Sequence, residues 1–555
     1  MMFKLWSALR GIFQKFNLDY LIVFILALVV FSSLQGTFTL PEPDSFYHAK
    51  IAKFLSEGQV LHQLPWLQET DLANNFVDHH FLYHLLLVPF VMLDDPLVGV
   101  KTATTIFGSL AVLAFYWLLK SFKVVYPFFY IIVLFVSRDW LWRASLVKAP
   151  ALFLIFLLLA YYFLVKKRWL DLFIISFLAV WLYGGWPMMI ALTVFYWLAC
   201  WLLSRSFAGS WRQKVTPRLC LMKLLHLVVR KKRRRPVTEI TEHSQGAGFK
   251  NQNLPWAGLA ATVGGSVAGL VINPYFPANL HFYWVQIVKI AIINYQEIVR
   301  VGNEWYPYSP FNLITIHPLI CALLIMGLAL VVITFKKQSV HSLTWGLLAL
   351  ALLFLTLKSR RNIEFFIPLT IIFFAFSFNC YLKQFAKEEI KKIFNFKTTC
   401  LGVLLSIFVL TFLFQAPRDI LAVKKDMLVG FPINHYQEAA QWLRQNTPKH
   451  SVVFHSDWDD FPFLFYYNDH NYYLTGLDHT FMYEKDQEKY WLYENIISGK
   501  EQEDLAKKIK ENFNADYVFV EKSFVKLESN LSSSDSFKQV YEDKKTKIYQ
   551  IINND

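Results

Sequence analysis

The chain has 555 residues, of which 55% are hydrophobic and 17% are aromatic, and its formal net charge is +14. Because the apolar residues gather in long blocks, the composition excludes an ordinary soluble globular protein. Lysines and arginines cluster between these blocks, as the positive-inside rule describes, so their excess gives no reason to expect a nucleic-acid partner.

The apolar blocks predict roughly eleven membrane-spanning helices, at about 20 residues each and fewer where a helix is buried in a bundle. In chain order they cover residues 18–37, 99–120, 124–137, 149–165, 169–184, 186–204, 256–273, 313–334, 341–358, 363–383 and 397–415. A further apolar stretch, Phe81–Leu93, is short and has charged residues on both sides. We expect this stretch to lie at the outer membrane interface rather than to cross the bilayer.

Clusters of positive charge set the expected orientation of these helices. Lys166–Arg168, residues 204–255, Lys336–Lys337 and residues 383–397 all fall on one side, which the positive-inside rule identifies as the cytoplasm. The N-terminus then lies inside and the C-terminus outside. The same scheme makes external loops of residues 38–98, 138–148 and 274–312.

The cytoplasmic loop 204–255 contains the basic run Arg230–Arg235. Such a run is typical either of nucleic-acid binding or, in a polytopic membrane protein, of a topogenic loop that contacts anionic lipid. We favour the second interpretation, so the expected partner is membrane lipid and not nucleic acid.

The composition changes from about Ala416, where polar and charged residues increase. The periodicity of His435–Asn446 predicts a helix, and residues 451–455, 472–476 and 516–520 read as strands. The chain is therefore expected to be a mainly α polytopic membrane domain, residues 1–415, followed by an extracytoplasmic α/β domain, residues 416–555.

The first candidate site follows the first span and contains Glu42, Asp44 and His48. Ionisable residues at a membrane mouth are costly unless they face water, a metal or a substrate. Carboxylates with an imidazole nearby can hold a divalent ion that binds phosphate oxygens. The alternative is a polar loop in which Asp44 or Ser45 caps a helix that begins at Phe46.

Two further external segments carry polar side chains. His80 and His84, in the stretch that begins at Asp78, share a helix face with a spacing that suits zinc or copper, but we favour imidazoles at the lipid headgroup level. Asp139 is the one carboxylate of the Ser137–Arg143 segment, and it either contributes to a site or pairs with Arg138 or Arg143.

Three later segments also offer candidates. Glu304 lies near the end of the long external loop, and it either contributes to a site or is simply solvated. Arg360 and Arg361 stand at the outer end of a span, where positive charge is disfavoured, so they bind an anion such as phosphate or pair with Glu364. Asp457–Asp460 follow a predicted strand and form either a binding site or a turn.

Together these motifs resemble the type C membrane glycosyltransferases, most closely the catalytic subunit of oligosaccharyltransferase. The resemblance rests on Glu42–His48 after the first span, a late-loop Glu304, the Arg360–Glu364 segment and an external C-terminal domain. The segment Glu438–Pro448 is similar to the one that precedes that family's Trp-Trp-Asp-Tyr-Gly motif. Two features depart from the family: only Trp458 and Asp459 match that motif, and Val147-Lys148-Ala149 stands where the second loop usually has an acid.

The resemblance implies an integral-membrane glycosyltransferase that uses a polyprenyl-phosphate or polyprenyl-diphosphate sugar donor at the outer face. The acceptor would be a glycan, a lipid or a protein. Asp44 and Glu42 are expected to be catalytic. His48, Arg360, Arg361, Trp458 and Asp459 are expected to bind substrate, and Asp44, Asp139 and Glu304 to hold Mg²⁺ or Mn²⁺.

Two alternatives remain at the level of sequence. One is protein glycosylation of the oligosaccharyltransferase type. The other belongs to a different class, a transporter or a non-catalytic membrane protein with an external sensory domain. Gly184-Gly185-Trp186-Pro187 and Gly264-Gly265 are the features that suggest broken transporter helices.

Overall fold

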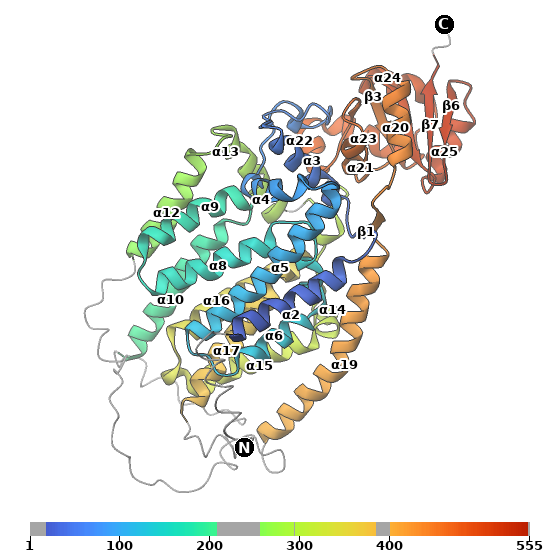
Figure 1. The fold of residues 1–555 in the computed structure, drawn as a ribbon. Coiled ribbons are helices and arrows are strands. Elements are labelled where there is room, and N and C mark those ends of the chain that lie inside the picture. Colours follow the sequence, from blue (N-terminus) through green and yellow to red (C-terminus); the bar gives the residue numbers. More distant parts are fainter. Residues whose placement is uncertain (1–17, 208–255, 294, 385–399, 553–555) are drawn as a thin grey trace, which may run out of the picture.

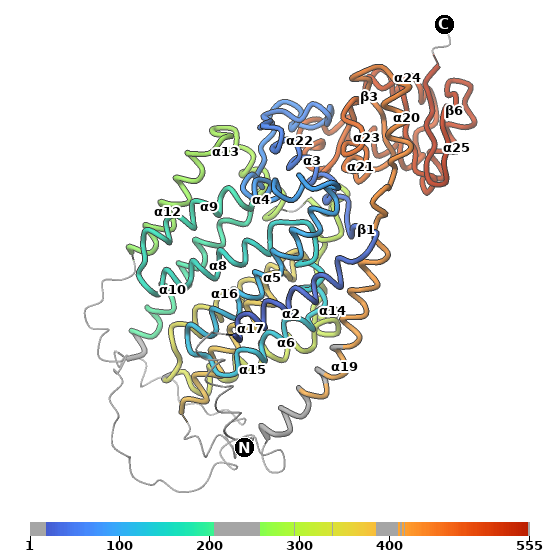
Figure 2. The backbone as a smooth tube through the Cα atoms, in the orientation of Figure 1, coloured from blue at the N-terminus to red at the C-terminus, as the bar shows by residue number. Residues whose placement is uncertain are grey.

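The computed structural model describes residues 18–207, 256–293, 295–384 and 400–552. An elongated bundle of apolar helices carries a smaller α/β unit at one end (Figure 1). The described part of the chain begins in the bundle and ends in the α/β unit at the other end of the molecule (Figure 2). The basic run Arg230–Arg235 falls outside the described residues.

The bundle is formed by helices that coincide with the expected spans. They are α2 (Leu18–Gln35), α5 (Pro96–Ser121), α6 (Pro127–Phe135), α8 (Pro150–Val165), α9 (Trp169–Leu182), α10 (Pro187–Phe207), α12 (Trp256–Val271), α14 (Pro310–Ile316), α15 (Pro318–Thr334), α16 (Val340–Lys358), α17 (Ile363–Leu382) and α19 (Cys400–Leu428). Asp95 caps α5, since its Oδ1 accepts a hydrogen bond from the Leu97 amide at 2.8 Å, and Pro96 occupies the first helical position.

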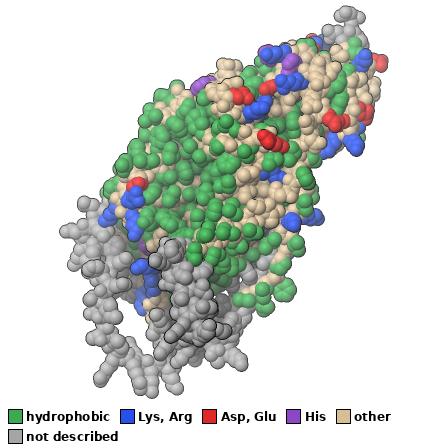
Figure 3. All heavy atoms as spheres, in the orientation of Figure 1, with side chains coloured by type: hydrophobic (Ala, Val, Ile, Leu, Met, Phe, Trp, Pro, Cys, Tyr) green, Lys and Arg blue, Asp and Glu red, His purple; other side chains and the backbone are tan. Residues whose placement is uncertain are grey.

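Within the described residues, five helices are long and apolar enough to cross a membrane, or six if α14 and α15, bent by 103°, count as one span. They are α2, α5, α10 and α16, together with the segment that contains α17. Shorter apolar helices such as α8, α9 and α12 complete the bundle. Figure 3 shows hydrophobic side chains over the visible face of the bundle, as expected of a multi-pass membrane protein, while the number of crossings and their orientation stay predictions.

A glycine allows a close contact between two helices of the bundle. A Cβ at Gly265 in α12 would stand 2.2 Å from the carbonyl oxygen of Phe173 in α9, so the two backbones touch only because Gly265 has no side chain. The Gly264-Gly265 pair therefore lies in an unbroken helix and serves helix packing.

The α/β unit contains a five-stranded mixed sheet in the order β4-β3-β5-β7-β6. Its strands are β3 (Val452–His455), β4 (Tyr472–Tyr473), β5 (Ala515–Glu521), β6 (Phe537–Glu542) and β7 (Thr546–Ile551). Strands β3, β4 and β5 confirm the three expected strands, and β3 runs parallel to both of its neighbours. Strands β6 and β7, which are antiparallel, were not predicted. The helix α20 (Gln437–Asn446) is also confirmed. Because α19 continues to Leu428, the α/β unit begins after that residue rather than near Ala416.

Two elements near the N-terminus join the bundle to the α/β unit. Strand β1 (Thr39–Leu40) pairs antiparallel with β2 (Phe431–Pro432). Helix α3 (Asp44–Ser56) then lies between α4 (Phe81–Val91) and α21 (Asp460–Tyr467). Phe46 of α3 is fully buried, with its ring centroid 4.8 Å from that of Phe463. This packing fixes the residues that open α3 between the two parts of the protein.

Candidate functional site

A cavity of about 630 Å³ lies where the end of the bundle meets α3 and the α/β unit. All of the site residues that the sequence suggested line it: Glu42, Asp44, His48, Asp139, Glu304, Arg360, Arg361, Trp458 and Asp459. These residues come from segments distributed over most of the chain. Their location at one cavity is therefore a property of the fold, whereas their individual roles stay predictions.

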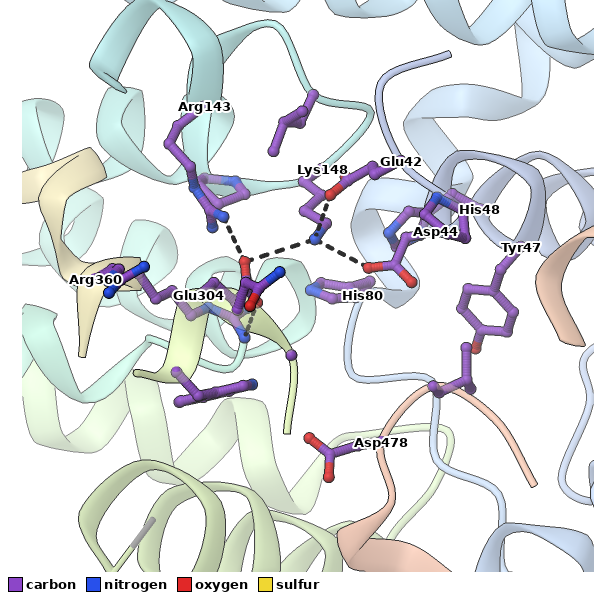
Figure 4. Close-up of a pocket in the computed structure, with 18 of the residues that line it drawn as sticks. Glu42, Asp44, Tyr47, His48, His80, Arg143, Lys148, Glu304, Arg360 and Asp478 are labelled. Atoms are coloured by element: carbon purple, nitrogen blue, oxygen red, sulfur yellow. Dashed lines mark hydrogen bonds and ion pairs between the residues drawn. The ribbon is translucent and has the colours of Figure 1, made fainter. Parts of the chain in front are cut away.

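Lys148 occupies the centre of the cavity's charged wall. Its ammonium Nζ lies 2.8 Å from Glu42 Oε2, 2.9 Å from Asp44 Oδ2 and 3.8 Å from Glu304 Oε2. Figure 4 shows Lys148 with Glu42 and Asp44 on one side and Glu304 on the other. The lysine side chain is only 10% exposed, so these contacts are shielded from water. Sequence reasoning noted Lys148 only as the place where an acid is missing, and gave it no role.

Glu304 is held by two further cations. Arg143, from the short helix α7 (Arg138–Ala144), forms an ion pair with Glu304, and its Nη2 lies 2.7 Å from Glu364 Oε2. Arg361 Nη1 lies 3.2 Å from Glu304 Oε1. The expected alternative partners are therefore wrong: Glu364 pairs with Arg143, while Arg361 pairs with Glu304. Arg361 also lies over the Trp305 ring, 4.9 Å from its centroid, which fixes the plane of the guanidinium.

Burial and neighbouring charge drive the pKa values of the two glutamates in opposite directions. Burial, together with the charge of Asp44, raises the pKa of Glu42 to about 7 despite the attraction of Lys148. Glu42 Oε1 is buried without a hydrogen-bond partner, which agrees with this shift. Burial alone would also raise the pKa of Glu304, but Lys148, Arg143 and Arg361 outweigh it and hold that pKa well below its ordinary value.

Asp44 opens α3 without capping it. The helix begins at Asp44, and neither Asp44 nor Ser45 makes a side-chain cap, so the interpretation of these residues as a helix cap is wrong. The Asp44 side chain is 35% exposed, compared with 18% for Glu42 and 23% for Glu304. Asp44 is therefore the most accessible of the carboxylates around Lys148.

Asp139 lines another part of the same cavity. Its Oδ2 accepts hydrogen bonds from the Tyr308 hydroxyl at 2.5 Å and from His317 Nε2 at 3.0 Å. Burial would raise the pKa of Asp139, but the hydrogen bond and charge of His317 outweigh it and lower the value. Arg138 pairs with Asp426 instead, at 2.8 Å. The expected pairing of Asp139 with Arg138 or Arg143 is therefore wrong.

The α/β unit contributes Trp458 and Asp459 to the cavity. They follow strand β3, as expected, in a turn that Asp460 stabilises by accepting a hydrogen bond from the Asp457 amide at 2.8 Å. Arg300 pairs with Asp457 at 2.7 Å. Burial and the nearby charge of Asp457 raise the pKa of Asp459 to about 7. The segment thus forms a turn and a cavity wall at once.

Buried imidazoles form a hydrogen-bonded chain behind Asp44. Asp78 Oδ2 lies 2.7 Å from His84 Nδ1, and His84 Nε2 lies 2.7 Å from His48 Nδ1. His80 and His84 are buried inside the protein, so their imidazoles contact other side chains rather than lipid headgroups. If ionised Asp78 accepts a hydrogen bond from His84 Nδ1, then His84 Nε2 accepts one from His48 Nδ1. The unprotonated nitrogen of His48 is then Nε2.

The expected metal site does not match these contacts. Asp44, Asp139 and Glu304 line one cavity, but Asp44 contacts Lys148, Asp139 contacts Tyr308 and His317, and Glu304 contacts arginines. No group of three or more His, Cys, Asp or Glu suited to a metal ion occurs in the part of the chain that the structure describes. The donor set therefore does not fit Mg²⁺ or Mn²⁺ in the arrangement that the sequence suggested.

The helical bundle and the attached α/β unit have a fold similar to that of solved type C membrane glycosyltransferases. Among solved structures, the oligosaccharyltransferase AglB of Archaeoglobus fulgidus, in complex with an inhibitory peptide and a dolichol-phosphate, is 13% identical, with a TM-score of 0.59 over 92% of this chain and 70% of that one. The apo form of the A. fulgidus oligosaccharyltransferase gives 13% identity and a TM-score of 0.58 over 97% and 75% of the two chains.

A third structure is ArnT of Cupriavidus metallidurans bound to undecaprenyl phosphate. It is 14% identical, with a TM-score of 0.51 over 97% of this chain and 99% of that one. No family model matches the sequence, and no curated protein matches it either. The similarity is thus one of fold, and it confirms the resemblance to type C glycosyltransferases at that level.

Proposed function

We propose that the protein is an integral-membrane glycosyltransferase that transfers a sugar or oligosaccharide from a polyprenyl-phosphate or polyprenyl-diphosphate donor to an acceptor at the outer face of the membrane. The observation that carries the proposal is the single cavity in which Asp44, Arg360 and Arg361 all lie, at the end of a type C fold. A carboxylate and cations at one cavity are the groups that glycosyl transfer from a phosphate requires.

The proposed reaction divides the work between these groups. Asp44 accepts the proton of the acceptor hydroxyl or amide, and the acceptor atom forms a bond to the anomeric carbon of the sugar. The bond between that carbon and the phosphate oxygen breaks, and the phosphate leaves with the bonding electrons. Asp44 is favoured as the base because it is the most accessible of the carboxylates around Lys148.

The arginines are suited to the departing phosphate. Arg361 is held in one orientation by Glu304 and Trp305, and Arg360 lies over the Tyr308 ring, 5.5 Å from its centroid. A fixed, planar guanidinium can bind two phosphate oxygens at once. We assign the polyprenyl phosphate to this side of the cavity.

Trp458 and Asp459 are our candidates for the acceptor side. They belong to the α/β unit and line the cavity together with Asp44. Protein glycosylation of the oligosaccharyltransferase type remains the second form of this proposal, because these two residues match the family's C-terminal motif. A transporter is less well supported, since Gly264-Gly265 lies within a continuous packed helix.

Substitution of Asp44 by asparagine tests the proposal. We expect Asp44→Asn to lower transfer of labelled sugar from a polyprenyl-phosphate donor by about 10²- to 10⁴-fold, because the variant lacks the base. Asp94→Asn makes the same change at an exposed position and serves as the control. Full transfer by Asp44→Asn, at normal expression and with the control also active, would remove Asp44 from the mechanism.

A further inference from the structure

The arrangement around Lys148 differs from a metal site in a specific way. Glu42 and Asp44 come from the start of α3 and Glu304 from the loop before α14, so carboxylates from distant segments converge on one point. The group at that point is a lysine ammonium contributed by the chain itself. Figure 4 shows these contacts meeting at the Lys148 nitrogen.

We infer that the Lys148 ammonium is the built-in cation of this site, that it takes the place of a divalent ion, and that sugar transfer proceeds without a metal. The inference rests on the proposed function for its reference to transfer. The expectation that no divalent ion binds the carboxylate cluster does not depend on that function, because it is drawn from the contacts of Lys148.

Charge balance supports the inference. Lys148, Arg143 and Arg361 face the carboxylates of Glu42, Asp44, Glu304 and Glu364, so three positive charges meet at most four negative ones. A divalent ion among these carboxylates would stand beside a lysine that is 10% exposed and would make the cluster net positive. Water screens such repulsion poorly at a buried position.

The position of Lys148 is also fixed by the backbone. Its amide donates to the Leu146 carbonyl at 2.8 Å, and Pro150, two residues later, is the first residue of α8 and lines the cavity. The lysine is thus anchored at a loop-to-helix junction rather than on a flexible loop. An ammonium carries three N–H donors, so it can contact Glu42 and Asp44 and still meet a phosphate oxygen.

Mn²⁺ binding by the purified full-length protein tests this inference, measured as loss of the free Mn²⁺ signal in electron paramagnetic resonance. We expect the wild type to bind no stoichiometric Mn²⁺ and Lys148→Asp to bind it at least about tenfold more tightly, because the variant exchanges a cation for a further carboxylate ligand. Lys53→Asp makes the same change at an exposed position of α3 and should gain no site. If Lys148→Asp does not fold, Lys148→Met removes the ammonium without adding a charge and should also gain Mn²⁺ affinity.

Sugar transfer after exhaustive chelation supplies the second measurement. Unchanged transfer by the wild type supports the inference. Two results would overturn the inference. One is stoichiometric Mn²⁺ binding by the wild type that disappears in Asp44→Asn. The other is sugar transfer that is lost on chelation and restored by Mn²⁺. If the wild type transfers no sugar from any polyprenyl phosphate, the proposed function fails, while the Mn²⁺ measurement still decides whether Lys148 occupies a metal's place.

Discussion

Replacing Glu42 by glutamine should make the protein's stability less dependent on pH. The folded state raises the pKa of Glu42 from 4.5 to about 7, so folding favours the protonated form. The stability linked to this proton is fully present below about pH 4.5 and is lost as the pH rises through about 7. At roughly 1.36 kcal/mol per pKa unit, the full loss is about 3 kcal/mol, of which about 2 kcal/mol falls between about pH 5.5 and pH 8.5.

Glutamine does not titrate, so Glu42→Gln avoids the loss of stability that comes from deprotonation of Glu42. For a chain of 555 residues, about 2 kcal/mol corresponds to roughly 2 °C in the unfolding midpoint. The difference in midpoint between variant and wild type should therefore move by roughly 2 °C in favour of the variant across this pH range, measured by thermal unfolding in detergent. Other groups, such as Asp459, titrate in both proteins and cancel in the difference. Parallel pH curves for the two proteins would refute the reasoning.

Two further predictions concern the arginines. Arg143→Met should lower the free energy of unfolding by about 3–5 kcal/mol, because it leaves Glu364 and Glu304 without their shared cation. Adding Glu364→Gln to this variant should restore part of the lost stability. Equal stability of Arg143→Met and the wild type would contradict this prediction. Arg361→Lys should raise the apparent KM for the polyprenyl donor with little change in thermal stability, because lysine cannot reproduce a two-point phosphate contact. A lowered unfolding midpoint with unchanged KM would instead give Arg361 a structural role through Glu304.

Long apolar runs made the helical bundle predictable from the sequence. Every expected span coincides with a helix, and strand β3 was located to within one residue at its start. The hairpin of β6 and β7 was missed because its strands carry charged and polar residues along much of their length, as in Phe537–Glu542, and so lack a clear apolar alternation. The end of α19 was missed because polar residues begin before the helix ends.

Many of the residues that line the cavity could also be predicted from the sequence, because ionisable residues near the ends of spans are costly unless they serve a function. The contacts between these residues could not be predicted. A single lysine such as Lys148, next to Ala149 and Pro150, has no local pattern that indicates three carboxylate contacts. Likewise, the sequence could not show that Arg143 turns toward Glu364 or that His317 contacts Asp139, since these pairs join distant parts of the chain. The one available signal was the missing acid at position 148.

The pairing of β1 with β2 determines when the cavity can form during synthesis. Thr39 Oγ1 donates to the Met427 carbonyl, 388 residues further along the chain, and Thr39 then pairs with Pro432. At about 5–20 residues per second, the ribosome supplies that partner on the order of 20–80 s after Thr39 itself. The helices of the bundle thus emerge before Glu42 and Asp44 acquire their final support, and a chain cut short before β2 lacks the element that holds these acids in place. A segment made late thus supports the acids that a segment made early supplies.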